Sequence, residues 1–183
     1  MGYDIALSKA WSELESLAKN RQIEVRLLAD NYQVDLANRR ILSLSCNVPA
    51  KEYLSILILH YLAKKLQGLP VVGDEWIDFR QLDGGQGYYP AFKKRVALTI
   101  VKKYGANPQA LLGLNERFKI EKADFADVSI VLDVFDNVPV LIELWKADEE
   151  FSPEVNMLFD KSIKDIFCTE DIVILAETVA HSI

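Results

Sequence analysis

The residues best suited to chemistry are carboxylates gathered in one short segment. Asp148, Glu149 and Glu150 follow a strongly apolar stretch, with Glu143 before them and Asp160 after them. Hard divalent cations prefer oxygen ligands, so the three consecutive carboxylates and Asp160 are candidate metal ligands. The alternative is a solvated acidic turn after a strand, because exposed carboxylates are the rule on protein surfaces.

Two further residues could act as a general acid or base. Glu143 lies in an apolar segment predicted to be a strand, where burial would raise its pKa. In the alternative interpretation, Glu143 reaches water at the strand end. His60 lies inside an apolar helical pattern, where it is either a base or a core residue held by one hydrogen bond. No second histidine follows nearby to complete a ligand pair, and His181 is expected to be inert.

A glycine-bearing segment, residues 83–87, precedes a helix predicted to begin at Pro90. Exposed amides at a helix start attract anions, and nearby cations would assist them. The segment matches neither a P-loop nor a dinucleotide fingerprint, and the alternative is a turn followed by solvated lysines. We predict a pocket joining residues 76–92 to residues 145–160. Its candidate ligand-binding residues are Arg80, Tyr88, Lys93, Trp145 and Glu150.

Length and composition limit the class of protein. The chain has 183 residues, half of them hydrophobic, and a net charge of −6. This length suits one domain over residues 1–183 with a full core. The negative charge disfavours nonspecific nucleic-acid binding, which needs a basic surface. Cys46 and Cys168 have no CxxC spacing, which is typical of a reduced, cytoplasmic protein.

No membrane association is expected from the hydropathy pattern. The longest near-continuous apolar stretch, residues 53–66, carries a histidine and two lysines. It is shorter than the ~20 residues needed to cross a bilayer. The N-terminus has no signal-peptide pattern.

Hydrophobic periodicity predicts an α+β fold. Apolar residues recur at helical spacing over residues 3–19, 50–67, 90–104 and 169–183. Residues 24–46 and 128–145 instead alternate with a period of two, as antiparallel hairpins do. We expect these hairpins to form one sheet or two adjacent sheets, with the helices 50–67 and 90–104 covering the apolar face.

Turn signals predict the strand registers. A two-residue turn at residues 30–31 would set Arg26 opposite Asp35, a favourable cross-strand pair. A second turn at residues 38–40 would set Val34 beside Leu44.

The later hairpin has its own turn signal at residues 136–137. The simplest register from this turn places Glu143 opposite Ile130, on a largely apolar face. The raised pKa expected for Glu143 depends on this register.

Three blocks in a fixed order carry a family resemblance. They are Leu-His-Tyr-Leu at 59–62, a segment at 76–88 with paired glycines, and residues 145–160 followed by Thr-Glu-Asp at 169–171. Together they resemble an uncharacterised domain-of-unknown-function family of anaerobic bacteria and archaea. Some members carry a four-cysteine iron–sulfur module, and the family is associated with corrinoid and one-carbon metabolism. This chain has no such cysteine motif and should not hold a cluster itself.

Two functional hypotheses follow from these patterns. The first is a small-ligand or protein-binding accessory module, which the resemblance would link to corrinoid or one-carbon metabolism. The second is a metal-dependent hydrolase using the carboxylates of residues 143–160, with Glu143 or His60 as the base. The sequence leaves the ligand, the cofactor and the oligomeric state open.

Overall fold

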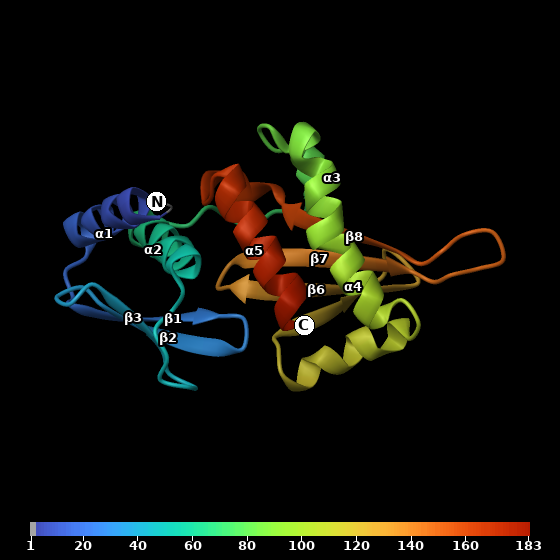
Figure 1. The fold of residues 1–183 in the computed structure, drawn as a ribbon, viewed down its shortest axis with the longest axis horizontal. Helices are drawn as coiled ribbons and strands as arrows, with labels where there is room; N and C mark the ends of the chain where they lie inside the picture. Colours follow the sequence, from blue (N-terminus) through green and yellow to red (C-terminus); the bar gives the residue numbers. More distant parts are fainter. Residues whose placement is uncertain (1–2) are drawn as a thin grey trace.

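The protein is represented by a computed structural model that describes residues 3–183 and contains two antiparallel sheets (Figure 1). The earlier part of the chain forms a three-stranded sheet in the order β1-β2-β3. Its elements are α1 (Asp4–Leu17), β1 (Gln22–Leu27), β2 (Asp30–Asp35), β3 (Arg40–Ser43) and α2 (Glu52–Gln67). The two helices pack against each other, and α2 contacts β1. The predicted α+β class is confirmed.

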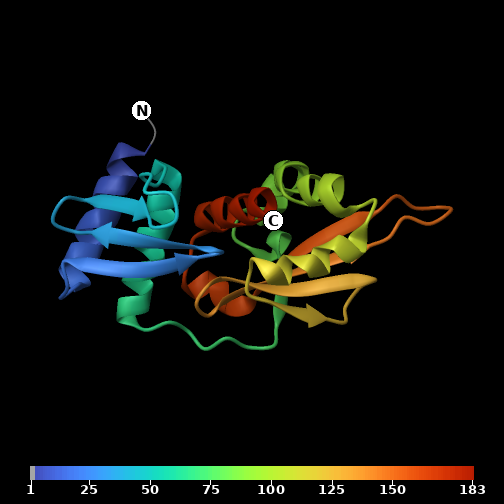
Figure 2. The same ribbon diagram turned by 90° about the horizontal axis from the view of Figure 1, so that it is seen from below.

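The later part of the chain forms a five-stranded sheet in the order β4-β8-β7-β6-β5. Its strands are β4 (Trp76–Asp78), β5 (Ile120–Ala123), β6 (Val128–Phe135), β7 (Val138–Trp145) and β8 (Glu154–Asp160). Its helices are α3 (Gly85–Arg95), α4 (Ala97–Tyr104) and α5 (Thr169–Ser182), with short 3-10 helices at Phe79–Gln81, Pro108–Glu116 and Lys161–Asp165. Figure 2 shows this part beside the three-stranded sheet, with α3, α4 and α5 on one face of the larger sheet.

The helix-covered face of the larger sheet is the centre of the core. Leu132, Val140 and Phe159 lie side by side on adjacent strands and are fully buried. Phe159 meets Phe92 of α3 edge-on, with ring centroids 6.4 Å apart. Strand β8, which the sequence interpretation did not include, therefore supplies part of the core.

Most helices lie where the apolar period places them. The segments predicted at 3–19, 50–67 and 169–183 are helical, with ends trimmed by a few residues. Gly68 ends α2 with a φ of 111°, a conformation that favours glycine. The segment 90–104, predicted as one helix, belongs to two helices. No helix within residues 3–183 has the length and apolarity needed to span a membrane.

The predicted helix start at Pro90 is wrong. Helix α3 begins at Gly85, and Pro90 lies inside it, where it lacks an N–H for the helical ladder. Gly84 precedes the helix in the left-handed conformation, with a φ of 72°. Phe92 of α3 stacks on Phe79 with ring centroids 4.1 Å apart. This packing of α3 onto the core favours the observed helix start.

The first hairpin uses a different turn from the one predicted. Strands β1 and β2 are joined by a turn at Leu28 instead of residues 30–31. The predicted contact between Arg26 and Asp35 is therefore wrong. Leu28 adopts a φ of 55°, and its N–H donates to the carbonyl oxygen of Val134 at 2.7 Å. A tertiary hydrogen bond thus stabilises a turn that local sequence preference does not indicate.

The β2–β3 register is also shifted from the prediction. Val34 pairs with Ile41, and not with Leu44. The Asp30 carboxylate, expected in a turn, instead accepts hydrogen bonds from Ser43 Oγ at 2.6 Å and from the Ser45 N–H at 3.3 Å. These bonds hold β3 in the observed register.

The second hairpin has the predicted turn but not the predicted register. Phe135 pairs with Val138 across residues 136–137, and Asn137 has a φ of 59°. An irregularity between Asp133 and Phe135 then shifts the pairing by one residue. A β-bulge of this kind inserts an unpaired residue, and a one-residue slip moves every later side chain relative to its expected partner.

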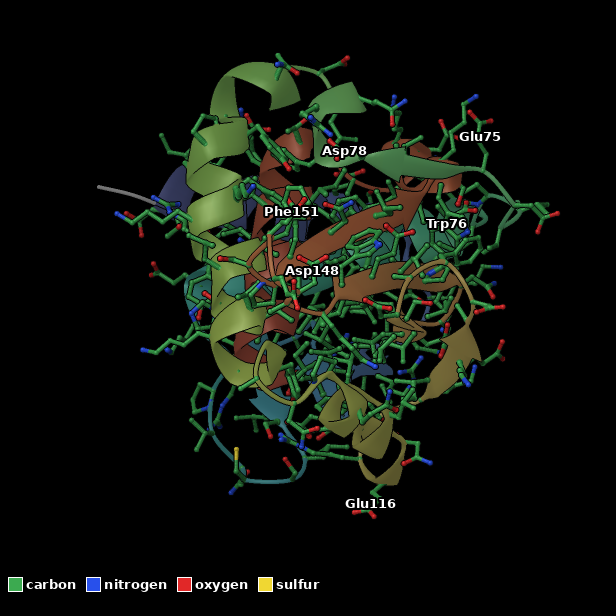
Figure 3. All side chains as sticks on the ribbon, turned by 90° about the vertical axis from the view of Figure 1, so that its right-hand side faces the viewer. Glu75, Trp76, Asp78, Glu116, Asp148 and Phe151 are labelled. Carbon is green, nitrogen blue, oxygen red and sulfur yellow. The ribbon has the colours of Figure 1, made fainter. Side chains whose placement is uncertain are left out.

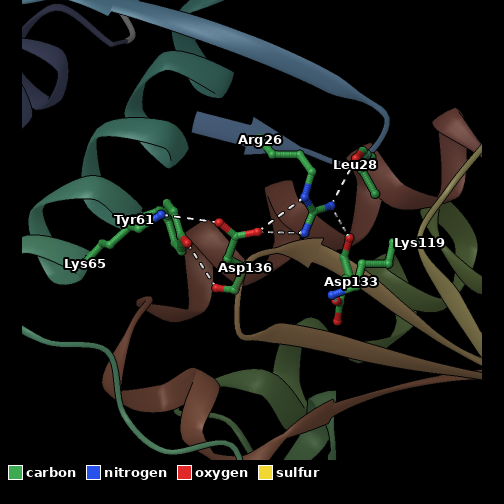
Figure 4. A network of polar contacts seen from close by, with 7 residues as sticks. All are labelled: Arg26, Leu28, Tyr61, Lys65, Lys119, Asp133 and Asp136. Carbon is green, nitrogen blue, oxygen red and sulfur yellow. Dashed lines mark hydrogen bonds and ion pairs between the residues drawn. The ribbon is translucent and has the colours of Figure 1, made fainter. Parts of the chain in front are cut away.

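A polar network joins the two sheets (Figure 4). The Arg26 guanidinium on β1 donates to the Asp136 carboxylate at 3.1 Å and to the carbonyl oxygen of Asp133 at 3.0 Å. From α2, Lys65 donates to the same Asp136 carboxylate at 3.3 Å, and the Tyr61 hydroxyl donates to the Asp136 carbonyl at 3.0 Å. The β6–β7 turn is therefore held by both β1 and α2.

Candidate functional site

The acidic segment lies on the loop between β7 and β8. Asp148, Glu149 and Glu150 are all exposed. The Asp148 carboxylate accepts hydrogen bonds from the backbone N–H groups of Glu150 at 2.8 Å and Phe151 at 2.7 Å. Figure 3 looks onto this loop, with Asp148 and Phe151 labelled. The carboxylate therefore stabilises its own turn, and Phe151 is exposed beside it.

Asp160 is separated from these carboxylates. It ends β8 opposite Trp76, whereas the acidic loop precedes the first residue of β8, so the separation is on the order of 20 Å along the strand. Asp160 is 2% exposed. Its carboxylate accepts from the N–H groups of Gly73 at 3.1 Å and Ser162 at 3.0 Å. Within residues 3–183, no three His, Cys, Asp or Glu side chains converge to hold a metal ion.

Glu143 is buried in the middle of the larger sheet. It faces Ser129 on β6 and Asn156 on β8, so the predicted position opposite Ile130 is wrong because of the β6 bulge. The side chain is 8% exposed. Burial raises the pKa of Glu143, and a hydrogen bond with Asn156 partly offsets the rise. The direction of this pKa shift agrees with the expectation, although the neighbours differ.

His60 has a carboxylate partner from another helix. Its Nδ1 lies 2.8 Å from Oδ2 of Asp171 in the first turn of α5. The hydrogen bond with Asp171 raises the pKa of His60, while burial acts in the opposite direction. Cys168 donates to the same carboxylate oxygen at 3.3 Å, and burial raises its thiol pKa to about 11. The raised pKa favours the protonated thiol, which is the less nucleophilic form.

The predicted ligand-binding residues lie on several elements of the larger part of the fold. Arg80 pairs with Asp78 at 2.8 Å and lies over the Tyr89 ring at 4.6 Å. Lys93 pairs with Glu154, the first residue of β8, at 3.2 Å. Trp145 is half-buried at the end of β7, and Glu150 is exposed in the loop after it.

Tyr88, the remaining predicted residue, lines a groove beside α5. This groove has a volume of about 980 Å³. Helix α5 forms its floor and contacts α2 on one side and α3 on the other (Figure 1). The floor includes Val173, Ile174, Glu177, Thr178 and His181. One wall, at the start of α2, includes Lys51, Tyr53 and Leu54. The other wall, formed by α3 and the residues before it, includes Asp83, Tyr88 and Arg95.

Hydrogen bonds connect the α3 wall to the floor. Arg95 Nη1 donates to the Tyr88 hydroxyl oxygen at 2.7 Å and to Glu177 Oε1 at 3.2 Å. Further along the groove, Thr169 Oγ1 donates to the carbonyl oxygen of Asp83 at 2.9 Å. These bonds fix the position of the α3 wall over α5.

Sequence reasoning missed most of this groove. Its floor is the last helix, whose pattern predicted only a helical tail, and Lys51 looks like an ordinary surface cation. Arg95 was among the cations expected to assist an anion near residues 83–87, but its contact with the last helix was not predicted. One signal was available: Glu170 and Glu177 lie seven residues apart, so they share a helix face with Ile174. A partly polar face on the last helix indicates that this face is exposed to solvent. It does not indicate which other elements lie beside that face.

The sequence profile of the family described as "Domain of unknown function (DUF3786)" matches residues 10–182. The chain belongs to this family. No curated protein and no solved structure matched the chain. The groove above α5 lies almost wholly within the matched region, so it is part of the family domain.

Proposed function

We propose that this member of the DUF3786 family is a binding module that holds a small molecule in the groove above α5. The observation that carries the proposal is the groove itself. Its volume of about 980 Å³ lies at the upper end of the roughly 300–1,000 Å³ usual for ligand sites. Such sites combine apolar surface with a few placed polar groups, as Val173 and Ile174 do here with Tyr88 and Arg95.

The resemblance to proteins of anaerobic bacteria and archaea supports a narrower version of the proposal. In that version, the module serves corrinoid or one-carbon metabolism, with a small cofactor or a partner protein as its ligand. An iron–sulfur module on some relatives would supply redox chemistry outside this chain. Corrinoids and nucleotides are therefore the first compounds to test.

A thermal-shift screen tests the coarse proposal. A ligand that binds only the folded state raises Tm by an amount that grows with its concentration. We would screen divalent metal ions, corrinoids and nucleotides for a rise in the Tm of the protein. A compound that binds in the groove should lose its effect when the groove is filled by Thr178→Trp.

Thr99→Trp is the matched control. Thr99 and Thr178 are both half-buried helix residues whose Oγ1 donates to the carbonyl four residues earlier, at 2.7 Å in each case. Only Thr178 lines the groove. Stabilisation that survives in Thr178→Trp but is lost in Glu150→Gln or Phe151→Ala would place the site on the β7–β8 loop and contradict the proposal.

A further inference from the structure

We infer that the groove above α5 takes a small organic oxyanion, with a carboxylate, phosphate or sulfonate group on an apolar body. This inference rests on the proposed function, because it names the ligand class of the same groove. The two walls carry the observations that support it.

Each wall presents a tyrosine together with a cation. Beside α2, Lys51 Nζ lies 5.9 Å from the centroid of the Tyr53 ring. Beside α3, the guanidinium carbon of Arg95 lies 5.8 Å from the centroid of the Tyr88 ring. All four side chains line the groove, so two positive charges and two aromatic faces flank the same space.

Arg95 is held in place with donors left over. Its Nη1 bonds Tyr88 and Glu177, while Nε and Nη2 make no hydrogen bond to residues 3–183. Its side chain is 55% exposed, so these remaining N–H groups are accessible. Because the Tyr88 hydroxyl accepts from Arg95, its own proton is available to a ligand. Two adjacent donor groups therefore point to an oxyanion, which guanidinium binds well.

Lys51 is the cation of the opposite wall. Its ammonium forms no ion pair and no hydrogen bond with the described part of the chain, residues 3–183. It precedes the first turn of α2, where the helix dipole disfavours a cation. An anion in the groove would offset this repulsion.

The carboxylates of the groove determine where the anion would lie. Glu177 is already paired with Arg95. Glu170 and Asp83 lie at the other end of the groove, where Thr169 Oγ1 donates to the backbone carbonyl oxygen of Asp83. Glu170 and Glu177 are about 10 Å apart along α5, so an anion beside Arg95 avoids the acidic end. The apolar body would rest on Val173 and Ile174.

Two dyes with the same ring system test this ligand class. 1-Anilinonaphthalene-8-sulfonate carries an anion on an aromatic body, and N-phenyl-1-naphthylamine is its uncharged counterpart. We expect the sulfonate dye to bind about tenfold more tightly, as measured by fluorescence titration. Arg95→Gln and Lys51→Gln should each weaken the sulfonate dye about five- to tenfold and leave the neutral dye unchanged. Lys94→Gln, an exposed cation outside the groove, is the control.

The outcomes separate this inference from the proposed function. If Thr178→Trp abolishes binding of both dyes but their affinities are equal, the groove binds ligands and the oxyanion preference is overturned. Tighter binding of a cationic naphthylamine would overturn it as well. If Thr178→Trp affects neither dye, the groove is not the site and both proposals fail. Circular dichroism of each variant confirms that it is folded.

Discussion

His60 and Asp171 form one short hydrogen bond between α2 and α5. Asp171 itself is buried, and the nearby titratable groups include Cys168, which directly precedes α5, and Glu13 on α1. The bond favours the protonated imidazole, so the pKa of His60 is raised above its ordinary value of 6.5. A histidine with a raised pKa adds stability that is fully present below its unfolded pKa. That stability is lost as the pH rises through the folded pKa.

We therefore predict a pH dependence carried by this pair. Between pH 6 and pH values above the folded pKa of His60, the wild type should lose more unfolding free energy than His60→Gln does. In Asp171→Asn, the pKa of His60 should fall, as followed by NMR titration of the ring. His181 bonds only a backbone carbonyl and serves as an internal control. An unchanged His60 titration in Asp171→Asn would contradict the prediction.

Arg26 is the second residue whose role can be tested singly. Its guanidinium satisfies the Asp136 carboxylate and two carbonyl oxygens at once. Burial raises the pKa of Asp136, but hydrogen bonds from Arg26 and Lys65 outweigh that effect and lower the pKa overall.

Arg26→Ala should lower the unfolding free energy by about 2 kcal/mol, because hydrogen bonds to charged groups are lost and two partly buried carbonyls lose their donor. Arg26→Lys should recover little, since a single ammonium cannot replace the planar guanidinium. Urea denaturation measures both effects. Arg21→Ala, an exposed residue on the same part of the chain, should change stability by less than about 0.5 kcal/mol.

At the scale of elements, helix α3 contains two glycines with opposite expectations. A Cβ at Gly85 would lie 2.0 Å from the carbonyl oxygen of Phe79, whereas a Cβ at Gly87 would meet nothing within 4 Å. Gly85→Ala should therefore destabilise the protein by more than about 2 kcal/mol, because backbone must move.

Gly87→Ala in the same helix should stabilise the protein by about 0.5–1 kcal/mol, through helix propensity and lower unfolded-state entropy. Thermal unfolding of the two variants makes the comparison. If Gly85→Ala stabilised the protein and Gly87→Ala destabilised it, α3 would not begin in contact with the Phe79 carbonyl.

Elements with local signals were predictable, and elements fixed by distant contacts were not. The apolar period and Gly68 identify α2, and the Asp136–Asn137 turn identifies the second hairpin. The turn at Leu28 could not be predicted, because it depends on a bond to β6. Strand β8 alternates Val155, Met157 and Phe159 with more exposed residues, so its signal was present but was not interpreted as a strand.

The groove could not be predicted from the sequence for a related reason. Residues adjacent in sequence, such as the carboxylates at 148–150, are easily recognised as candidates, but these three are exposed to solvent. The groove instead brings Lys51, Tyr88 and Glu177 together from three helical regions. Only the packing of α2 and α3 on either side of α5 places these residues in one space.

At the scale of the whole molecule, buried side chains form one continuous core. A single cluster includes Trp11 and Val34 from the first part of the chain and Phe135 and Leu175 from the second. Tyr61 on α2 stacks on Phe135 with ring centroids 4.2 Å apart. The polar network of Figure 4 also joins the first part of the chain to the second.

We predict that both sheets unfold in one transition. Variants that keep only Trp11, or only Trp145, would report on the two parts separately by fluorescence in urea. Within each variant, the unfolding midpoint seen by fluorescence should coincide with the midpoint seen by circular dichroism. Two separate midpoints within one variant, seen by different probes, would show that the parts unfold independently.

Helix α5 contributes Leu175, Ala176 and Val179 to the core with one face and floors the groove with the other. Changes on such a helix perturb stability and recognition together, whereas the two flanking walls can vary with little effect on the interior. Homologues that evolve new ligand preferences should therefore diverge first around Lys51 and Tyr88, while the terminal helix stays comparatively constant.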